Sequence, residues 1–126
     1  MSLLCPIDFR YGRPEMKSVF GEEGRLQRLL DVEAALARAH AKVGNIPAAA
    51  ATLVAAKANT RAVTVDRVKK LEEQTRHDIM AVVLALSEAC DKDAARYVHL
   101  GATSNDISDT ATALQLRDAI RVLTDD

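Results

Sequence analysis

Residues 97–111, with the sequence YVHLGATSNDISDTA, combine groups that bind anions with groups that start a helix. Gly101 can adopt the backbone angles of a turn, and Thr103 or Ser104 can cap the helix that follows. Backbone N–H groups at a helix N-terminus attract negative charge. His99 is the group in this stretch that titrates near neutral pH. The stretch therefore predicts either an ordinary capped helix or a site for a carboxylate.

Two aspartates in the same stretch argue against an anion site. Asp106 and Asp109 can satisfy the start of a helix themselves, and their charge repels an anion unless the side chains turn away. On these residues alone, the capped helix has about as much support as the carboxylate site.

The segment TRHD, residues 75–78, presents a similar choice. Arg76, His77 and Asp78 precede an apolar helical pattern, so they lie where helix N–H groups and the helix dipole attract anions. A neighbouring carboxylate can also fix the tautomer of an imidazole, although adjacent residues on a helix do not face each other. The alternative is a helix start with Thr75 as its cap. Both interpretations stay open.

The segment DFRYG, residues 8–12, lies before the first predicted helix. Arg10 offers a planar set of donors and Tyr11 a phenolic donor, and this pair suits a phosphate group. An equally good interpretation is that both side chains tie the N-terminal segment onto the helices.

Apolar residues at helical spacing predict that helices position all three segments. The predicted helices cover residues 14–20, 22–43, 48–58, 64–73 and 79 to about 90, followed by a connector over 91–95 and a final helix that runs to the chain end. Pro14 suits the first turn of a helix, and Thr64 suits an N-cap. Glu33 and His40 interrupt the apolar face of the second helix and need partners. We predict that both are structural and give them no catalytic role.

The composition predicts an all-α protein with an aliphatic core. Of the 126 residues, 48% are hydrophobic but only 3% are aromatic, which favours close-packed helices over sheets. The net charge of −1, with both signs interspersed, argues against a nucleic-acid partner. Cys5 and Cys90 lack the spacing of a disulfide framework or a zinc site, and no apolar run reaches the length of a membrane span. We therefore expect a cytoplasmic protein with free thiols, no metal and no membrane partner.

Together, these segments resemble one family closely. The chain contains RYG, RLQRLLDVEAALARAHAKVGNIP, TRHDIMA and HLGATSNDISDTATALQLRDA in the order found in the N-terminal region of adenylosuccinate lyase, a family of the fumarase/aspartase superfamily. The similar cycloisomerases that act on 3-carboxymuconate share two of these segments but typically lack TRHD. They are the alternative within the superfamily. A helical assembly module without catalysis is the alternative outside it.

The resemblance implies a β-elimination that removes fumarate from adenylosuccinate to leave AMP, and from the succinylocarboxamide ribotide of purine biosynthesis. It implies a small-molecule nucleotide as partner, with no cofactor and no metal. Carried onto this sequence, it makes His77 and His99 catalytic. It makes six residues substrate-binding: Arg10, Tyr11, Arg76, Asp78, Thr103 and Ser104.

The resemblance also implies a division into domains and an assembly. Residues 1–103 are expected to form an N-terminal helical lyase domain, and residues 104–126 the start of the first long helix of a central bundle. A homo-oligomer is expected, a tetramer in the full-length family. The family's serine loop, of pattern SSxMPxKxNP, and its second histidine motif do not occur in these 126 residues. The resemblance places the general base and acid on these two motifs, so we predict that the chain is the N-terminal part of a larger lyase and is inactive alone.

Overall fold

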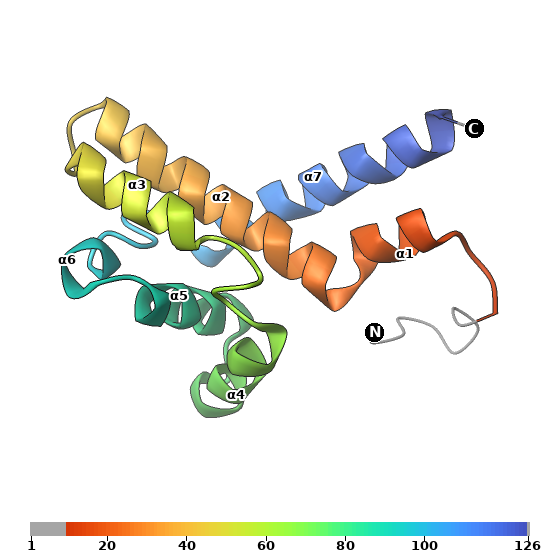
Figure 1. Cartoon of the computed structure of the whole chain (residues 1–126), viewed down its shortest axis with the longest axis horizontal. Coiled ribbons are helices and arrows are strands. Elements are labelled where there is room, and N and C mark those ends of the chain that lie inside the picture. Colours follow the sequence, from red (N-terminus) through yellow and green to blue (C-terminus); the bar gives the residue numbers. More distant parts are fainter. Residues whose placement is uncertain (1–9, 126) are drawn as a thin grey trace.

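The computed structural model describes residues 10–125, and these residues form seven α-helices and no strand (Figure 1). The helices are α1 (Pro14–Phe20), α2 (Glu22–Lys42), α3 (Ala48–Lys57), α4 (Val65–Thr75), α5 (Asp78–Ala89), α6 (Lys92–Ala95) and α7 (Ser104–Thr124). The all-α class predicted from the composition is confirmed. The predicted thiol of Cys5, the first nine residues of the predicted N-terminal domain and the final residue lie outside the described range.

The helix positions predicted from apolar spacing agree closely with the structure, except in one segment. The connector predicted over residues 91–95 is instead the short helix α6. The Asp91 carboxylate accepts a hydrogen bond from the Ala94 N–H at 2.7 Å, and this cap starts the helix. The prediction is wrong here because so short a helix shows no apolar period.

α2 is the central helix of the fold and contacts α1, α3, α4, α5 and α7 (Figure 1). Its apolar residues recur at intervals of three and four, so they share one face. The buried residues of α2 are Leu26, Leu29, Leu30, Glu33, Ala34 and Ala37. Glu33 is therefore a carboxylate within an otherwise apolar face.

The core is aliphatic, as the composition predicts. Its largest fully buried apolar side chains come from four helices and one loop: Leu30, Val54, Val63, Leu86 and Ile107. Many of the remaining core residues are alanines, which allow helix backbones to approach closely. Several helices therefore share one core. Their packing fixes the N-terminal ends of α5 and α7 relative to α2.

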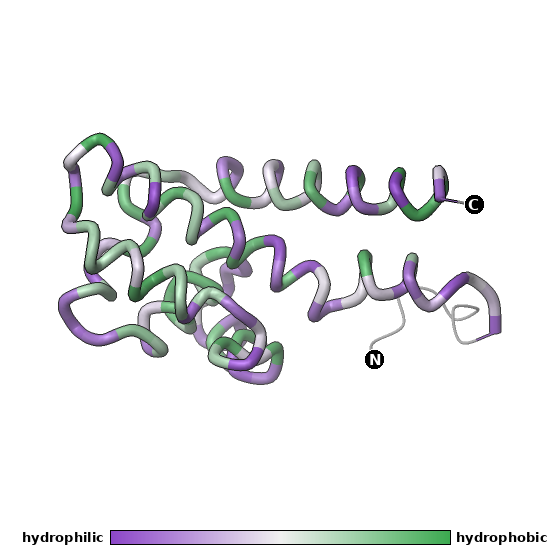
Figure 2. The backbone as a smooth tube through the Cα atoms, turned by 45° about the horizontal axis from the view of Figure 1, so that its top comes forward, coloured by the Kyte–Doolittle hydropathy of each residue, from purple (hydrophilic) through white to green (hydrophobic). Residues whose placement is uncertain are grey.

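α7 buries one face and exposes the rest. Its buried residues recur every four positions and pack toward the other helices: Ile107, Ala111, Gln115 and Ala119. Figure 1 shows that the C-terminal part of α7 extends away from α3, α5 and α6. Three large apolar side chains in this part, Leu116, Ile120 and Leu123, are exposed. Figure 2 shows hydrophobic segments close to the C-terminal end of this helix.

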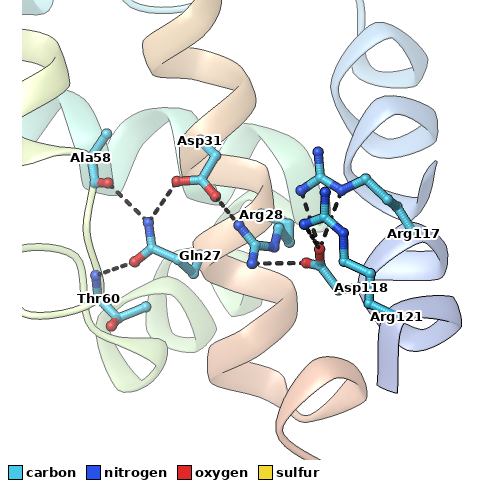
Figure 3. Close-up of polar contacts among 8 residues, drawn as sticks. All are labelled: Gln27, Arg28, Asp31, Ala58, Thr60, Arg117, Asp118 and Arg121. Atoms are coloured by element: carbon cyan, nitrogen blue, oxygen red, sulfur yellow. Dashed lines mark hydrogen bonds and ion pairs between the residues drawn. The ribbon is translucent and has the colours of Figure 1, made fainter. Parts of the chain in front are cut away.

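A polar network holds α2 against α7 and against the loop after α3 (Figure 3). The Arg28 guanidinium contacts the carboxylates of Asp31 at 2.7 Å and of Asp118 at 2.8 Å. On the other side of Asp31, the Gln27 amide donates to that carboxylate at 2.9 Å and to the Ala58 carbonyl at 3.2 Å. These contacts lie on elements that the candidate site also uses.

Among residues 10–125, no helix is long and apolar enough to cross a bilayer. Cys90 is a free, half-buried thiol at the end of α5. Burial, with a smaller effect from the neighbouring Asp91, raises the pKa of this thiol, so the protonated form is favoured.

Candidate functional site

The start of α7 is a capped helix, which was one of the two interpretations of the sequence. Thr103 is the N-cap residue, and its N–H donates to the Asp106 carboxylate at 2.9 Å. This is the carboxylate half of a capping box. Asp106 therefore supports the turn before α7 and adds negative charge beside it.

His77, and not Thr75, caps the start of α5. The imidazole Nδ1 of His77 accepts a hydrogen bond from the Met80 N–H at 3.2 Å. Thr75 belongs to the last turn of α4, and its hydroxyl contacts the backbone of His77. The interpretation of Thr75 as the cap is therefore wrong. Arg76 separates the two helices in the left-handed conformation, with φ of 54°, which lets α4 end and α5 begin within three residues.

Two of the three predicted segments meet at a contact between His77 and Ser104. The Ser104 Oγ lies 3.3 Å from the His77 Nε2, although the residues are 27 positions apart. Because Nδ1 accepts from a backbone N–H, the neutral ring carries its proton on Nε2 and donates it to the hydroxyl. The N-terminal ends of α5 and α7 thus bring an imidazole and a hydroxyl together at the surface.

His99 is held by a buried carboxylate that the sequence analysis assigned to structure. Its Nδ1 lies 2.6 Å from Oε1 of Glu33, which is 2% exposed in the middle of α2. Burial raises the pKa of Glu33, and the hydrogen bond and charge of His99 partly oppose that rise. The other oxygen of this carboxylate, Oε2, is buried without a hydrogen-bond partner among the described residues.

The turn that carries His99 is fixed by a second contact from α2. The His40 Nε2 lies 2.8 Å from the Leu100 carbonyl, and its Nδ1 accepts from the Asn45 side-chain amide at 2.9 Å. His99 and Gly101 both have positive φ, of 62° and 71°. A histidine tolerates this conformation only at some cost in strain, so the contacts from α2 keep the turn in place.

Sequence reasoning missed the role of Glu33 and His40 in this site. It correctly required a partner for each polar side chain, and both partners belong to residues 99–100. The available signal was their separation by seven positions, which places them two turns apart on the same side of α2. Nothing local in the sequence specifies which segment covers that side.

Of the remaining predicted residues, Asp78 is next to His77 in the chain, whereas the segment that contains Arg10 and Tyr11 is distant. Asp78 follows His77, and its carboxylate accepts from the Ile79 N–H at 2.8 Å. The Arg76 side chain borders an open surface hollow of about 450 Å³ together with Lys69, Glu72 and Glu73. The segment before α1, which contains Arg10 and the exposed Tyr11, lies at the far end of the molecule from the starts of α5 and α7 (Figure 1).

The groups assembled here can exchange protons and hold an oxyanion. His77 with Ser104 provides a donor pair, and His99 with Glu33 provides an imidazole oriented by a carboxylate. Within residues 10–125, no three His, Cys, Asp or Glu side chains gather closely enough to hold a metal ion. The imidazole, hydroxyl and carboxylate groups at this place can donate and accept protons and hydrogen bonds.

Comparison with known proteins places these residues in a family. A family model described as lyase matches residues 8–126. Adenylosuccinate lyase of Pyrococcus horikoshii is 57% identical over 118 residues, which are 94% of this chain and 26% of that protein. The enzyme of Methanothermobacter thermautotrophicus is 54% identical over 120 residues, 95% of this chain and 27% of that protein.

A solved structure gives the same result for the fold. The 3-carboxy-cis,cis-muconate lactonizing enzyme of Pseudomonas putida superposes with a TM-score of 0.86 at 36% identity. The superposition covers 94% of this chain and 27% of that enzyme. The chain therefore spans about a quarter of the length of the relatives that it matches. Since the family model covers residues 8–126, which are nearly the whole chain, this chain belongs to the lyase family.

Proposed function

We propose that the chain supplies part of the active site of an adenylosuccinate lyase. The observation that carries the proposal is the contact of His77 with Ser104, which joins the TRHD and GATSND segments at one place. Two adenylosuccinate lyases with more than half of their aligned residues identical to this chain support it. The substrate is a small-molecule nucleotide, from which fumarate is eliminated to leave AMP, and the succinylocarboxamide ribotide of purine biosynthesis is the second substrate.

Each predicted residue has a role in this proposal. A β-elimination needs a base for the Cβ proton, donors for the developing carboxylate charge and an acid for the leaving nitrogen. The resemblance assigns the base and the acid to the serine loop and the second histidine motif, which these 126 residues do not contain. His77 and His99 act beside them in the active site, and Thr103 and Ser104 hold the succinyl carboxylates of the substrate. Arg76 and Asp78 contact the nucleotide. The reaction itself requires no metal or organic cofactor.

Arg10 and Tyr11 are proposed as ligands of the nucleotide phosphate, but within one chain the segment before α1 lies away from the start of α5 (Figure 1). A homo-oligomer resolves this separation, because a neighbouring copy can bring its own N-terminal segment to the site. The proposed assembly is the tetramer of the full-length family, in the cytoplasm. The division into a domain of residues 1–103 and a bundle helix from residue 104 belongs to the same proposal.

A chimera tests the proposed activity. Residues 1–126 replace the matching N-terminal quarter of the Pyrococcus horikoshii enzyme, and conversion of adenylosuccinate to AMP and fumarate is measured. We expect turnover by the chimera and none by the 126-residue chain alone, because the chain covers only 26% of that relative. Turnover by the chain alone, or a folded chimera that does not react, contradicts the proposal.

Two substitutions of His77 separate its chemistry from its capping role. Asparagine is a good N-cap residue whereas alanine is a poor one, so His77→Asn keeps the unfolding free energy of the chain, while His77→Ala lowers it by about 1 kcal/mol. Both substitutions remove the imidazole, and we expect both to abolish turnover in the chimera. Leu53→Ala, at an exposed position of α3, is the matched control and retains activity. An active His77→Asn chimera contradicts the catalytic assignment.

A second chimera tests the alternative function, which is that of a cycloisomerase acting on 3-carboxymuconate. The solved lactonizing enzyme from Pseudomonas putida shares this fold at 36% identity. Joining residues 1–126 to the remainder of that enzyme gives a protein whose activity on 3-carboxymuconate can be measured. We expect this chimera to be folded but inactive. If neither chimera folds, NMR titration of the chain alone with AMP decides, because the proposal requires the His77 and His99 ring signals to shift.

A further inference from the structure

We propose that Glu33 is a positioning residue that fixes the tautomer of His99 and leaves its Nε2 free to accept a proton. The contact that carries this proposal is the 2.6 Å distance between the His99 Nδ1 and the Glu33 Oε1. Above its pKa the Glu33 carboxylate accepts hydrogen bonds and cannot donate them, so under those conditions Nδ1 carries the proton of the neutral ring. The lone pair of that ring is then on Nε2.

The three histidines of the chain differ in how their ring nitrogens are used. Both nitrogens of His40 and both nitrogens of His77 have protein partners. For His99, only Nδ1 has a partner among residues 10–125. Its side chain is 15% exposed, so the ring is mostly enclosed but still reaches the surface. His99 is thus the histidine whose second nitrogen remains available to a ligand.

The tautomers of the three rings are also different. His40 accepts on Nδ1 from the Asn45 amide and donates from Nε2 to the Leu100 carbonyl, and His77 accepts on Nδ1 from the Met80 N–H. Both rings therefore carry the proton on Nε2, which is also the form that free imidazole side chains prefer. The Glu33 carboxylate imposes the opposite form on His99.

The position of Glu33 agrees with a role beyond packing. Its side chain is almost fully buried among aliphatic residues of α2, and Oε2 has no hydrogen-bond partner in the described part of the chain. An apolar residue would fill the same space without burying a charge. A buried carboxylate with one unsatisfied oxygen is a feature that calls for a functional explanation. Orientation of the His99 ring supplies one.

A carboxylate on one nitrogen of an imidazole also makes the other nitrogen a stronger proton acceptor. Carboxylates that hold a metal-binding histidine in this way typically change metal affinity or activity by about tenfold to a hundredfold when removed, and we expect an effect of similar size here. As a contribution to catalysis, the inference rests on the function proposed above: His99 Nε2 meets the substrate as a hydrogen-bond acceptor while Nδ1–H remains on Glu33.

The tautomer can be measured on this chain without any lyase activity. Nitrogen-15 NMR of the imidazole rings separates a protonated from an unprotonated ring nitrogen. For the neutral His99 ring we expect a protonated Nδ1 and an unprotonated Nε2. Glu33→Leu should return His99 to the form protonated on Nε2, while the His40 ring, an internal control, keeps its tautomer. A wild-type His99 protonated on Nε2, or an unchanged tautomer in Glu33→Leu, overturns the proposal.

Kinetics of the Pyrococcus chimera test the catalytic consequence. Glu33→Gln keeps the shape of the side chain but removes its charge, so kcat should fall about tenfold to a hundredfold with little change in KM. In a chimera that already carries His99→Asn, the same change should cost nothing more, since Glu33 acts through His99. An additive loss indicates a purely structural role and contradicts the proposal.

The two measurements keep this inference separate from the proposed function. If the chimera is inactive but the His99 tautomer depends on Glu33, the lyase assignment fails and the positioning role stands. If the chimera is active but Glu33→Leu leaves the tautomer unchanged and Glu33→Gln leaves kcat unchanged, the positioning role fails and the lyase assignment stands. Glu33→Met, which also lacks a carboxylate or amide acceptor, replaces Glu33→Leu in the NMR experiment if the leucine variant does not fold.

Discussion

Burial and His99 act in opposite directions on the Glu33 carboxyl group, and burial has the larger effect. The pKa of this group is raised above its ordinary value of 4.5. At pH values between 4.5 and the folded-state pKa, the folded protein binds more protons at this site than the unfolded chain does. The unfolding free energy contributed by Glu33 therefore falls as the pH rises through that window.

The Glu33→Gln variant tests this pH dependence. Glutamine does not ionise, so the unfolding free energy of the wild type minus that of Glu33→Gln should decrease as the pH is raised from 4.5 toward neutrality. Denaturant unfolding at a series of pH values measures this difference. The prediction is wrong if the difference is constant or increases with pH.

Glu88 gives a control of opposite sign. It lies on the surface, where hydrogen bonds from Arg67 at 2.7 and 2.8 Å lower the pKa of its carboxyl group. A lowered pKa means that the ionised form stabilises the fold above the ordinary value of 4.5 and that this stability is lost as the pH falls. The difference between the wild type and Glu88→Gln should therefore increase with pH. Opposite slopes from the two variants tie each effect to its own carboxyl group.

Helices α1 to α5 and α7 were predictable because their signals are local. Pro14 stands in the first turn of α1 and Thr64 caps α4, as their residue types indicate. Apolar residues at three and four positions apart set the buried face of α2. By contrast, the pairing of Glu33 with His99 joins residues 66 positions apart. The sequence shows that Glu33 needs a partner, but the identity of that partner depends on how α2 and the turn before α7 pack together.

The N-cap residue of α4, Thr64, allows a test of whether a local sequence signal stabilises its helix. The Thr64 hydroxyl accepts from the Arg67 N–H at 3.2 Å, which satisfies one donor that the helix leaves unpaired. We expect Thr64→Ala to lower the unfolding free energy by about 1 kcal/mol in denaturant unfolding. Thr112→Ala is the control, since Thr112 is an exposed residue inside α7 whose hydroxyl bonds only to the preceding turn. Its effect should stay within about 0.5 kcal/mol. Equal effects of the two substitutions contradict the capping role.

At the scale of the whole molecule, α7 carries two different apolar surfaces. One is buried against the other helices, and Gln115 within it donates to the Val19 carbonyl of α1 at 2.8 Å. The other consists of Leu116, Ile120 and Leu123, which are 52%, 59% and 67% exposed. Their spacing of four and three residues places them on one face of the helix. Large apolar side chains gathered on one face mark a contact surface more often than single exposed residues do.

We predict that this face pairs with a second copy of the chain. Sedimentation of the chain over a range of concentrations should show self-association, because packing the two α7 faces together removes these side chains from water. The double substitution Leu116→Glu and Ile120→Glu places like charges in that contact and should leave a folded monomer. Leu53→Glu, on the exposed side of α3, adds a charge elsewhere and should not change the association. A wild-type chain that remains monomeric at the highest concentration, or association that survives the double substitution, contradicts the assignment of this face to a copy of the chain.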